Sequence, residues 1–156
     1  MLRRATAADA AAIGTLTRTA YAKWVPLIGR EPLPMTADHA VAVREHVIDL
    51  WEEDGRLIAL IEMIPGAAHL AIENLAVAPD RQGAGHGGRL LAHAEAVAVT
   101  LGLGEVRLYS NTAFAANLEF YARHGYRQTG REELVPGSVA VHMAKTLAGT
   151  VPPGEA

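Results

Sequence analysis

The sequence predicts an α/β fold with about seven strands and several helices. A strand, a glycine-rich loop and a helix follow one another between Leu70 and Leu101. The pair Asp54-Gly55 joins two apolar runs, which is the strongest short-range signal for a β-hairpin. Segments of strand and helix periodicity alternate along the chain as strand, two helices, three strands, helix, strand, helix and two strands.

Composition narrows the class of protein. A chain of 156 residues is long enough for one buried core, so we expect a single domain over residues 1–148 and a flexible tail at 149–156. A net charge of −3 without a basic cluster argues against a nucleic-acid partner. No stretch reaches the roughly 20 apolar residues of a membrane-spanning helix, so we expect no membrane partner.

The absence of cysteine excludes disulfides, thiolate metal sites and a cysteine nucleophile, and it fits a cytoplasmic location. The histidine pairs His39/His46 and His86/His93 are seven residues apart, whereas helical metal ligands are spaced by three or four. We therefore expect no metal site.

The N-terminal segment begins with a short strand at 2–5 and a helix capped by Thr6 or Asp9. The residues of that helix expected to face inward are Ala12, Ile13, Leu16 and Ala20. The following segment, 24–35, holds three prolines and several large apolar residues, which predicts an ordered loop.

A second helix is expected to begin at a Thr36 cap and to end between Val43 and His46. The hairpin strands should then occupy 47–52 and 56–64.

The central strand is expected at 70–78, where Pro79 ends it. Strict alternation would place Ala71, Glu73, Leu75 and Val77 on one face, and Ile72, Asn74 and Ala76 on the other. After the glycine loop, apolar residues at steps of three and four predict a helix with one buried stripe. This stripe consists of Leu90, Leu91, Ala94, Val97, Ala98 and Leu101.

The C-terminal part should contain a strand at 105–110 and a helix at 113–123. Asn111 and Thr112 are suitable caps for this helix, and Gly125 ends it. Two final strands are expected at 126–130 and 138–145.

The glycine loop 82–88 has glycine at four of its seven positions, and because glycine lacks a β-carbon, its backbone N–H groups at the start of a helix can approach a phosphate closely. A tight turn that only allows close packing is the alternative. A P-loop would need a lysine after its last glycine, and the only lysines are Lys23 and Lys145. The dinucleotide pattern G-x-G-x-x-G is present, but residues 79–82 separate it from the strand. The acidic residue that should follow about 20 residues later belongs at the end of the next strand, whereas Glu105 lies at its start.

Two segments together resemble the GNAT family of N-acetyltransferases. Residues 77–87 resemble its acyl-CoA pyrophosphate loop, with Gln82, Gly85 and Gly87 at the signature positions. Residues 117–126 resemble its later motif, a helix that ends in tyrosine, three residues, glycine and an aromatic residue. The resemblance covers nearly the whole chain and implies a three-layer α/β/α GNAT fold, in which helices cover both faces of a mixed, mostly antiparallel sheet of about seven strands. It also implies transfer of the acetyl group of acetyl-CoA to a primary amine by direct attack in a ternary complex.

The same resemblance implies which residues hold the coenzyme. The backbone of the loop would bind the pyrophosphate, and a strand backbone would pair with the pantetheine arm. Asn117, or else Asn111, would hydrogen-bond the pantetheine chain, although Asn111 also suits a helix cap. The full set is Leu75, Ala76, Val77, Gln82, Gly83, Ala84, Gly85, His86, Gly87, Asn111 and Asn117. We expect the His86 side chain to be solvated and His124 to complement the end of its helix.

Glu73 is the candidate general base, because a carboxylate within an apolar strand is unfavourable unless it is paired or functional. Its alternative role is a structural ion pair, and Glu62 on the preceding strand is the second candidate base. Tyr121 matches the family tyrosine that faces the sulfur and would protonate the leaving thiolate. Its alternative role is a core aromatic residue.

The acceptor is the least determined part of the prediction. Tyr21, Trp24, Leu33 and Met35 are candidates for contact with it, or else anchors of the core and loop. The acceptor could be a small amine, an amino acid, an aminoglycoside-like compound or a protein amine, and the formation of a homodimer stays open. A non-catalytic acyl-CoA-binding module is the alternative function, but a degenerate domain would be expected to lose Glu73 or Tyr121. An oxidoreductase is disfavoured by the context of the loop.

Overall fold

The computed structural model describes residues 1–148, which contain one seven-stranded sheet in the order β1-β2-β3-β4-β5-β7-β6. All neighbouring strands are antiparallel except β4 and β5, which are parallel. The strands are β1 Leu2–Arg4, β2 Val47–Glu53, β3 Arg56–Pro65, β4 Leu70–Val77, β5 Glu105–Asn111, β6 Arg127–Val135 and β7 Ser138–Thr146. The principal helices are α1 Ala10–Tyr21, α4 His39–Glu45, α5 His86–Thr100 and α6 Ala115–Arg123. This is the predicted α/β class with its mixed sheet.

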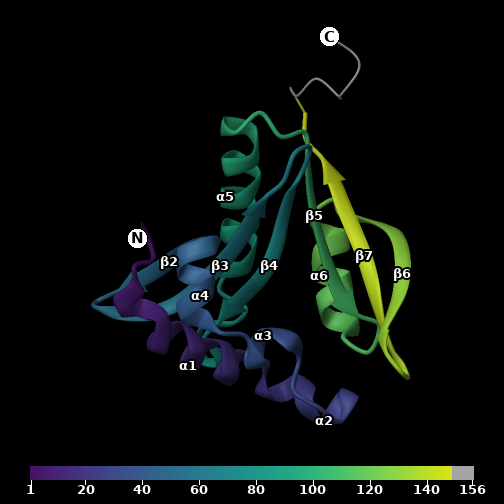
Figure 1. Ribbon diagram of the computed structural model, residues 1–156, viewed down its shortest axis with the longest axis horizontal. Coiled ribbons are helices and arrows are strands. Elements are labelled where there is room, and N and C mark those ends of the chain that lie inside the picture. Colours follow the sequence, from purple (N-terminus) through teal and green to yellow (C-terminus); the bar gives the residue numbers. More distant parts are fainter. Residues whose placement is uncertain (149–156) are drawn as a thin grey trace.

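Helices cover both faces of the sheet (Figure 1). One core lies between the sheet and α5, and it includes Ile61, Leu90, Leu91 and Val106, all fully buried. The second core lies under α1 and α4, where Ile13 and Ala42 pack against the opposite face. Burial of these apolar stripes holds the three layers together.

The parallel pair β4 and β5 separates soon after it forms. Only Leu70↔Val106 and Ala71↔Arg107 are paired, and beyond them the two strands diverge, with α6 beside β5 (Figure 1). The remainder of β4 is therefore paired with β3 on one edge, and no strand of residues 1–148 pairs with its other edge. This opening in the sheet positions the candidate site.

A β-bulge at Glu73 overturns the strict alternation predicted for the central strand. Glu62 pairs with Asn74 and Met63 pairs with Ile72, so Glu73 is the extra residue. Ile72 consequently shares a face with Leu75 and with Val77, against the α5 core. Alternation alone could not show this, because a bulge depends on the register with the partner strand.

Several predictions for the N-terminal half need correction. Ala12 is exposed on α1 rather than inward-facing. The predicted loop 24–35 instead contains two short helices, α2 Val25–Ile28 and α3 Leu33–Thr36, each with a proline in its first turn. Proline suits that position because its φ is already helical and its missing N–H would have no partner there. Short 3-10 turns lie at Ala7–Asp9, Ala22–Trp24 and Pro79–Arg81.

Asp38, not Thr36, caps α4. The Asp38 carboxylate accepts hydrogen bonds from the N–H groups of Ala40 and Val41, whereas Thr36 ends α3 and donates to Leu33 O. The hairpin turn at Asp54-Gly55 is confirmed, with positive φ at both residues, as a two-residue turn between twisted strands requires.

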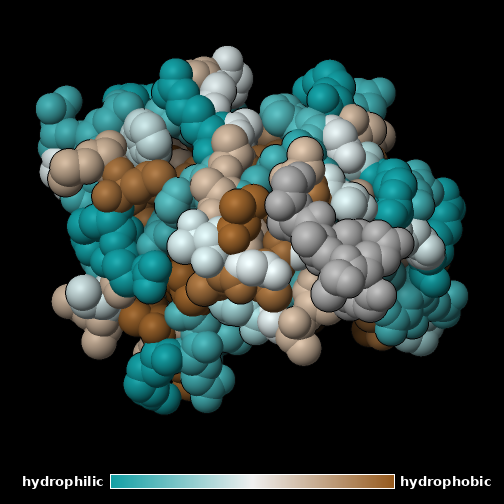
Figure 2. Space-filling view, turned by 90° about the horizontal axis from the view of Figure 1, so that it is seen from above, coloured by the Kyte–Doolittle hydropathy of each residue, from teal (hydrophilic) through white to brown (hydrophobic). Residues whose placement is uncertain are grey.

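The helix after the glycine loop begins earlier than expected, at His86, and the predicted buried Leu101 is 52% exposed just beyond its end. This end of the molecule is viewed in Figure 2, where hydrophobic residues lie among hydrophilic ones. Helix α6 begins at Ala115 instead of 113, and β6 extends to Val135, beyond the predicted 130.

No helix within residues 1–148 is long and apolar enough to cross a membrane. The tail predicted at 149–156 lies outside the described residues.

Candidate active site

A groove of about 410 Å³ lies where β4 and β5 separate, between the N-terminus of α5 and helix α6. Its cationic wall residues are Lys23, Arg81 and Arg123, and no aspartate or glutamate is among the described residues that line it. Arg81 is paired with Glu53, whereas Lys23 and Arg123 have no carboxylate partner among residues 1–148, so the groove wall is cationic in a chain whose net charge is −3. The groove is suited to an anionic ligand.

The glycine loop forms one end of the groove. Gly83 and Gly85 have φ values of +85° and +91°, a conformation that favours glycine. Gly85 is the N-cap of α5, so the first N–H groups of this 15-residue helix are directed toward the groove end. A phosphate placed there would meet both backbone donors and the positive end of the helix dipole.

The last two glycines of the loop allow close contact between α5 and α6. A β-carbon on Gly87 would lie 3.0 Å from Phe120 Cζ, and one on Gly88 would lie 2.9 Å from His124 Nε2. Both positions are in the first turn of α5, where the sequence predicted loop. These glycines therefore bring the Phe120 ring and the His124 ring into the groove wall.

The segment before the loop is fixed by ion pairs with the β2-β3 hairpin. Arg81 Nη1 lies 2.5 Å from Glu53 Oε2, and Arg56 contacts both carboxylate oxygens of Asp80 at 2.8 Å. Each pair is partly exposed and contributes little free energy of unfolding by itself. Together they define where the chain enters the glycine loop.

The unpaired edge of β4 forms the floor of the groove. Val77 O accepts a hydrogen bond from Gln82 Nε2 at 3.0 Å, and Leu75 O lies 3.3 Å from Tyr21 Oη, which shares its one proton with the nearer Asn74 Oδ1 at 2.9 Å. Side chains thus satisfy carbonyls that a neighbouring strand would otherwise satisfy. An extended ligand with amide groups could pair along this edge as an added strand.

His86 is 5% exposed, which corrects the expectation of a solvated side chain. Its ring packs edge-on against Trp51 of β2, with centroids 5.7 Å apart. The side chain therefore anchors the start of α5. His124 behaves as expected, because its Nδ1 lies 2.7 Å from Phe120 O, within hydrogen-bond distance of a carbonyl near the end of α6.

A second, smaller cavity of about 80 Å³ adjoins the groove, and we call it the acceptor cavity after the role proposed for it below. Tyr21, Asn117 and Tyr121 line both spaces, so the two meet at these side chains. The other wall residues are Ile28, Arg30, Pro32, Leu33, Pro34, Glu73, Tyr109, Ser110, Asn111, Phe114, Leu134, Ser138 and Ala140. Segments distant in the sequence, from the α2–α3 region to β7, thus enclose one space.

Tyr121 lies at the junction of the groove and the acceptor cavity. Burial raises the pKa of its hydroxyl to about 12, so the phenol stays protonated at neutral pH. No hydrogen bond to another described residue engages this hydroxyl. It is therefore free to donate to a ligand.

Glu73 faces the acceptor cavity from the β4 bulge. Its side chain is exposed, but the walls of the acceptor cavity displace part of the water around it. This desolvation raises the pKa of the carboxyl above its ordinary value. The nearby Glu62 carboxylate raises this pKa further, whereas His46 lowers it. Glu62 is 4% exposed, and its Oε2 lies 2.5 Å from His46 Nδ1.

The four predicted acceptor contacts do not lie together. Tyr21 and Leu33 line the acceptor cavity, and Trp24 lines the groove, where it stacks on Phe114 at a centroid distance of 4.5 Å. Met35 is buried and lines neither space, which fits its alternative interpretation as a core residue.

Most residues predicted to bind the coenzyme line the groove, but Ala84 and Asn111 do not. The Asn111 side chain accepts a hydrogen bond from Ala113 N at 2.9 Å and donates to Ser138 Oγ at 2.7 Å, so it engages the turn before α6. The N-cap of α6 is Phe114, which makes no side-chain capping hydrogen bond, so the expectation that Asn111 or Thr112 caps this helix is wrong. Sequence reasoning missed Arg30, Tyr109 and Ser138, because nothing local indicates that β5, β7 and the α2–α3 segment share one cavity. Among residues 1–148, no group of three histidine, aspartate or glutamate side chains could hold a metal ion.

Comparison with known proteins agrees with this geometry. The model of the Acetyltransferase (GNAT) family matches residues 15–126. S-(2-succino)cysteine N-acetyltransferase of Bacillus subtilis (strain 168) is 34% identical over 116 residues, covering 67% of this chain and 69% of that protein.

Two solved structures show the same fold. The ribosomal-protein-S18-alanine N-acetyltransferase of Escherichia coli is 20% identical, with a TM-score of 0.77, and the match covers 96% of each chain. The PaiA N-acetyltransferase of Thermoplasma acidophilum, in complex with coenzyme A, is 18% identical, with a TM-score of 0.75 over 94% of this chain and 98% of that one. The chain therefore belongs to the GNAT family and is an acetyl-CoA-dependent acyltransferase.

Proposed function

We propose that this protein transfers the acetyl group of acetyl-CoA to the primary amine of a small molecule, by direct attack within a ternary complex. The observation that carries the proposal is the meeting of two spaces at Tyr121. One is a cationic groove with a glycine loop, and the other is a small cavity that holds the Glu73 carboxylate. Two substrates can therefore be bound at once, with their reactive ends adjacent.

The groove fits acetyl-CoA by its chemistry. The N–H groups at the start of α5 and the cations of the wall suit the pyrophosphate, and the unpaired edge of β4 suits the amides of pantetheine. Asn117, on the first turns of α6, supplies an amide side chain between the groove and the acceptor cavity. These residues would hold and orient the thioester.

Glu73 is the proposed base. An amine attacks a thioester only as the free base, so a proton must leave the ammonium group before or during attack. The Glu73 carboxylate takes that proton, directly or through a water molecule, and passes it to the solvent. Once nitrogen has bonded to the acetyl carbon, the carboxylate takes the second proton that the nitrogen must lose to become an amide. Its raised pKa makes it a stronger proton acceptor than an ordinary glutamate.

Tyr121 is the proposed donor to the leaving group. As the carbon–sulfur bond breaks, the electron pair moves to sulfur, and the Tyr121 hydroxyl donates a hydrogen bond and then its proton to the thiolate. The phenolate recovers a proton from the solvent or from protonated Glu73. Because the pKa of Tyr121 is raised to about 12, proton transfer accompanies the growth of charge on sulfur rather than preceding it.

A small-molecule acceptor is favoured by the size of the cavity. It measures about 80 Å³, and α2 and α3 contribute wall residues from one side, so a folded protein surface has little access. The relative from Bacillus subtilis is named for a small amine, S-(2-succino)cysteine. A non-catalytic binding module would have no need for both Glu73 and Tyr121 beside one cavity.

The test is release of coenzyme A thiol on addition of amines to enzyme and acetyl-CoA, with S-(2-succino)cysteine in the amine panel. We expect release that depends on the amine, together with an acetylated product seen by mass spectrometry. Enzyme incubated with acetyl-CoA alone should keep its own mass, because attack is direct. A protein that gains one acetyl group and passes it to a later-added amine would contradict direct attack, and binding of acetyl-CoA without transfer to any amine would favour the non-catalytic alternative.

A further inference from the structure

The acceptor cavity has one cation and one anion in its wall. Among the described residues that line it, Arg30 is the only basic side chain and Glu73 the only acidic one. The rest of the wall is aromatic, aliphatic or neutral polar, including Leu33, Phe114 and Leu134. A ligand that fills this space meets two opposite charges separated by an apolar surface.

The two charges lie toward different ends of the cavity. Tyr121 also belongs to the groove, and Glu73 also lines the space beside His46 and Glu62. Arg30, Asn111 and Ser138 also line a neighbouring hollow, whose wall includes Gly137. Arg30 therefore marks the end away from the reacting groups.

Arg30 is held in place but not neutralised. It follows Gly29, whose φ of +71° ends α2, and its Nη2 donates to Ser138 Oγ at 2.9 Å. Asn111 Nδ2 donates to the same oxygen at 2.7 Å, so the Ser138 hydroxyl proton is used by neither contact. No carboxylate of the described part of the chain pairs with Arg30.

This cluster of donors lacks an anion. Arg30 Nη1 also donates to Glu31 O at 3.4 Å. Three of the five N–H groups of its planar guanidinium fork therefore have no partner among the described residues, and Ser138 keeps one O–H at the wall of the same cavity. A carboxylate is the group that matches this fork, because a guanidinium and a carboxylate can form two parallel hydrogen bonds. A partly buried guanidinium without a counter-ion gains the most from such a partner.

We propose that the acceptor is an amine that also bears a carboxylate, with the carboxylate bound by Arg30 and Ser138 and the amine directed toward Glu73. The inference rests on the proposed function. The charges of such a zwitterionic molecule match those of the cavity end to end, and its apolar part contacts Leu33, Phe114 and Leu134. This orientation brings the nitrogen, rather than the carboxylate, to the thioester.

The test compares matched acceptors in the thiol-release assay at fixed acetyl-CoA. Each acid is paired with its carboxamide, which keeps the amine and removes the negative charge. The acids are phenylalanine, glutamate, S-carboxymethylcysteine, β-alanine and 6-aminohexanoate, which differ in the distance between amine and carboxylate. We expect the favoured acid to exceed its carboxamide in kcat/KM by tenfold or more. Arg30→Met should remove this preference, with a loss of about 10- to 100-fold on the acid.

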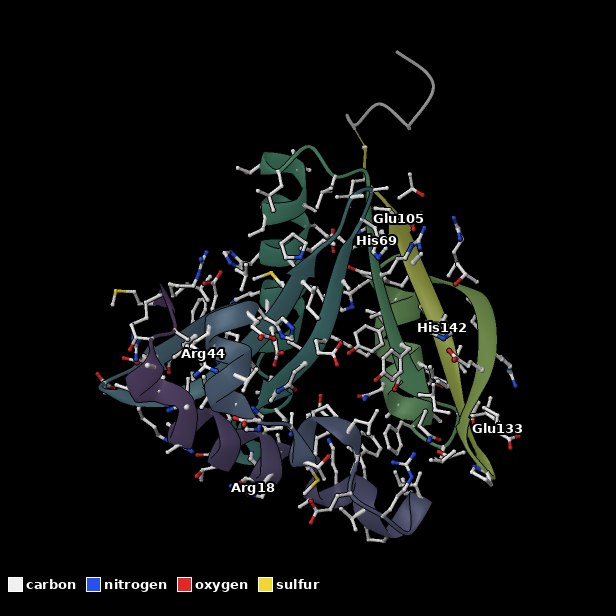
Figure 3. The ribbon with its side chains drawn as sticks, in the orientation of Figure 1. Arg18, Arg44, His69, Glu105, Glu133 and His142 are labelled. Atoms are coloured by element: carbon white, nitrogen blue, oxygen red, sulfur yellow. The ribbon has the colours of Figure 1, made fainter. Side chains whose placement is uncertain are left out.

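Two further variants separate recognition from folding. Arg30→Lys keeps the charge but loses the planar fork, so it should retain part of the preference. Arg30→Glu should reverse it, so that the carboxamides, or a diamine such as cadaverine, become better acceptors than the acid. Arg18→Met is the matched control, because Arg18 is exposed on α1 and lines no part of the acceptor cavity (Figure 3).

The outcomes are distinct for the two proposals. Acetylation of amines without preference for the acids, or a preference that survives in Arg30→Met, would overturn the carboxylate inference and leave the proposed function standing. If no amine is acetylated although acetyl-CoA binds, the proposed function itself fails. Retained melting temperatures in the Arg30 variants ensure that a loss reflects recognition.

Discussion

Replacement of Glu73 by glutamine should separate its role in catalysis from its effect on stability. The amide keeps the shape of the side chain but cannot accept the ammonium proton. General-base catalysis typically contributes about 10²- to 10⁴-fold, so kcat should fall within that range. The affinity for acetyl-CoA should stay within about threefold of that of the native protein, because Glu73 does not line the groove beside the glycine loop.

The pH dependence gives a sharper test of the same variant. In the native enzyme kcat should fall on the acid side as Glu73 takes up a proton, at a pH above the ordinary range of a glutamate, because desolvation and Glu62 raise its pKa. Glu73→Gln should lose this acid limb. Glu62→Gln removes the neighbouring negative charge, so the pKa of Glu73 should decrease and the limb should move to lower pH while most of kcat remains.

Stability should change in the opposite direction to activity. The pKa of Glu73 is raised in the folded state, so ionisation of Glu73 disfavours folding at every pH above its folded pKa and has no effect below its unfolded pKa. Glu73→Gln should therefore be slightly more stable at neutral pH and equal to the native protein in acid. Because the side chain is exposed to the cleft, the gain should be less than about 1 kcal/mol.

The assay is thiol release at saturating acceptor between pH 5 and 9, with urea unfolding measured in parallel at neutral and acid pH. A Glu73→Gln enzyme with native kcat and the native acid limb would refute the assignment of the base. If Glu62→Gln instead lost the limb, the second candidate would be the base.

Two other predictions concern tyrosines. Tyr121→Phe should lower kcat by about 10²-fold or more. The affinity for acetyl-CoA and the melting temperature should change little, because the Tyr121 hydroxyl bonds no other described residue. Tyr126→Phe is the control, because the Tyr126 hydroxyl contacts Glu95, and equal activity of the two variants would exclude Tyr121 from the reaction. Tyr21→Phe should lower the free energy of unfolding in urea by about 1–3 kcal/mol. The reason is that Asn74, which is 2% exposed, loses the hydroxyl that donates to its Oδ1 at 2.9 Å. An unchanged unfolding midpoint would show that this bond contributes nothing.

Much of the fold could be predicted from the sequence, because its signals are local. The Asp54-Gly55 turn requires positive φ at two successive residues, and the apolar steps of α5 are visible in the sequence. The prolines at 26 and 34 were misleading, because they begin short helices instead of preventing them.

The site was predictable only where its residues lie in one segment. The glycine loop and the α6 motif each form a continuous stretch and were identified together. The bulge at Glu73 was not predictable, because it exists only in register with Glu62 and Met63 on β3. The burial of His86 depends on Trp51 from a distant strand, and Arg30 meets Ser138 only after β7 has joined the sheet.

The central claim is that the groove beside the glycine loop binds acetyl-CoA. Thermal unfolding with and without acetyl-CoA tests it on the native protein, on Gly85→Ala and on Gly55→Ala. Gly85 and Gly55 both have positive φ and open space where a β-carbon would lie, so the backbone strain of the two variants is similar, about 1–2 kcal/mol, but only Gly85 lines the groove.

At a ligand concentration 100 times its Kd, acetyl-CoA should stabilise the native protein by about 2.7 kcal/mol, which raises the melting temperature by roughly 5–10 °C. The Gly55→Ala protein should show the same rise from a lower starting temperature, and Gly85→Ala should show much less. NAD and ATP should have no effect on any of the three. A native protein that does not respond to acetyl-CoA, or that responds to NAD instead, would contradict the assignment of the groove.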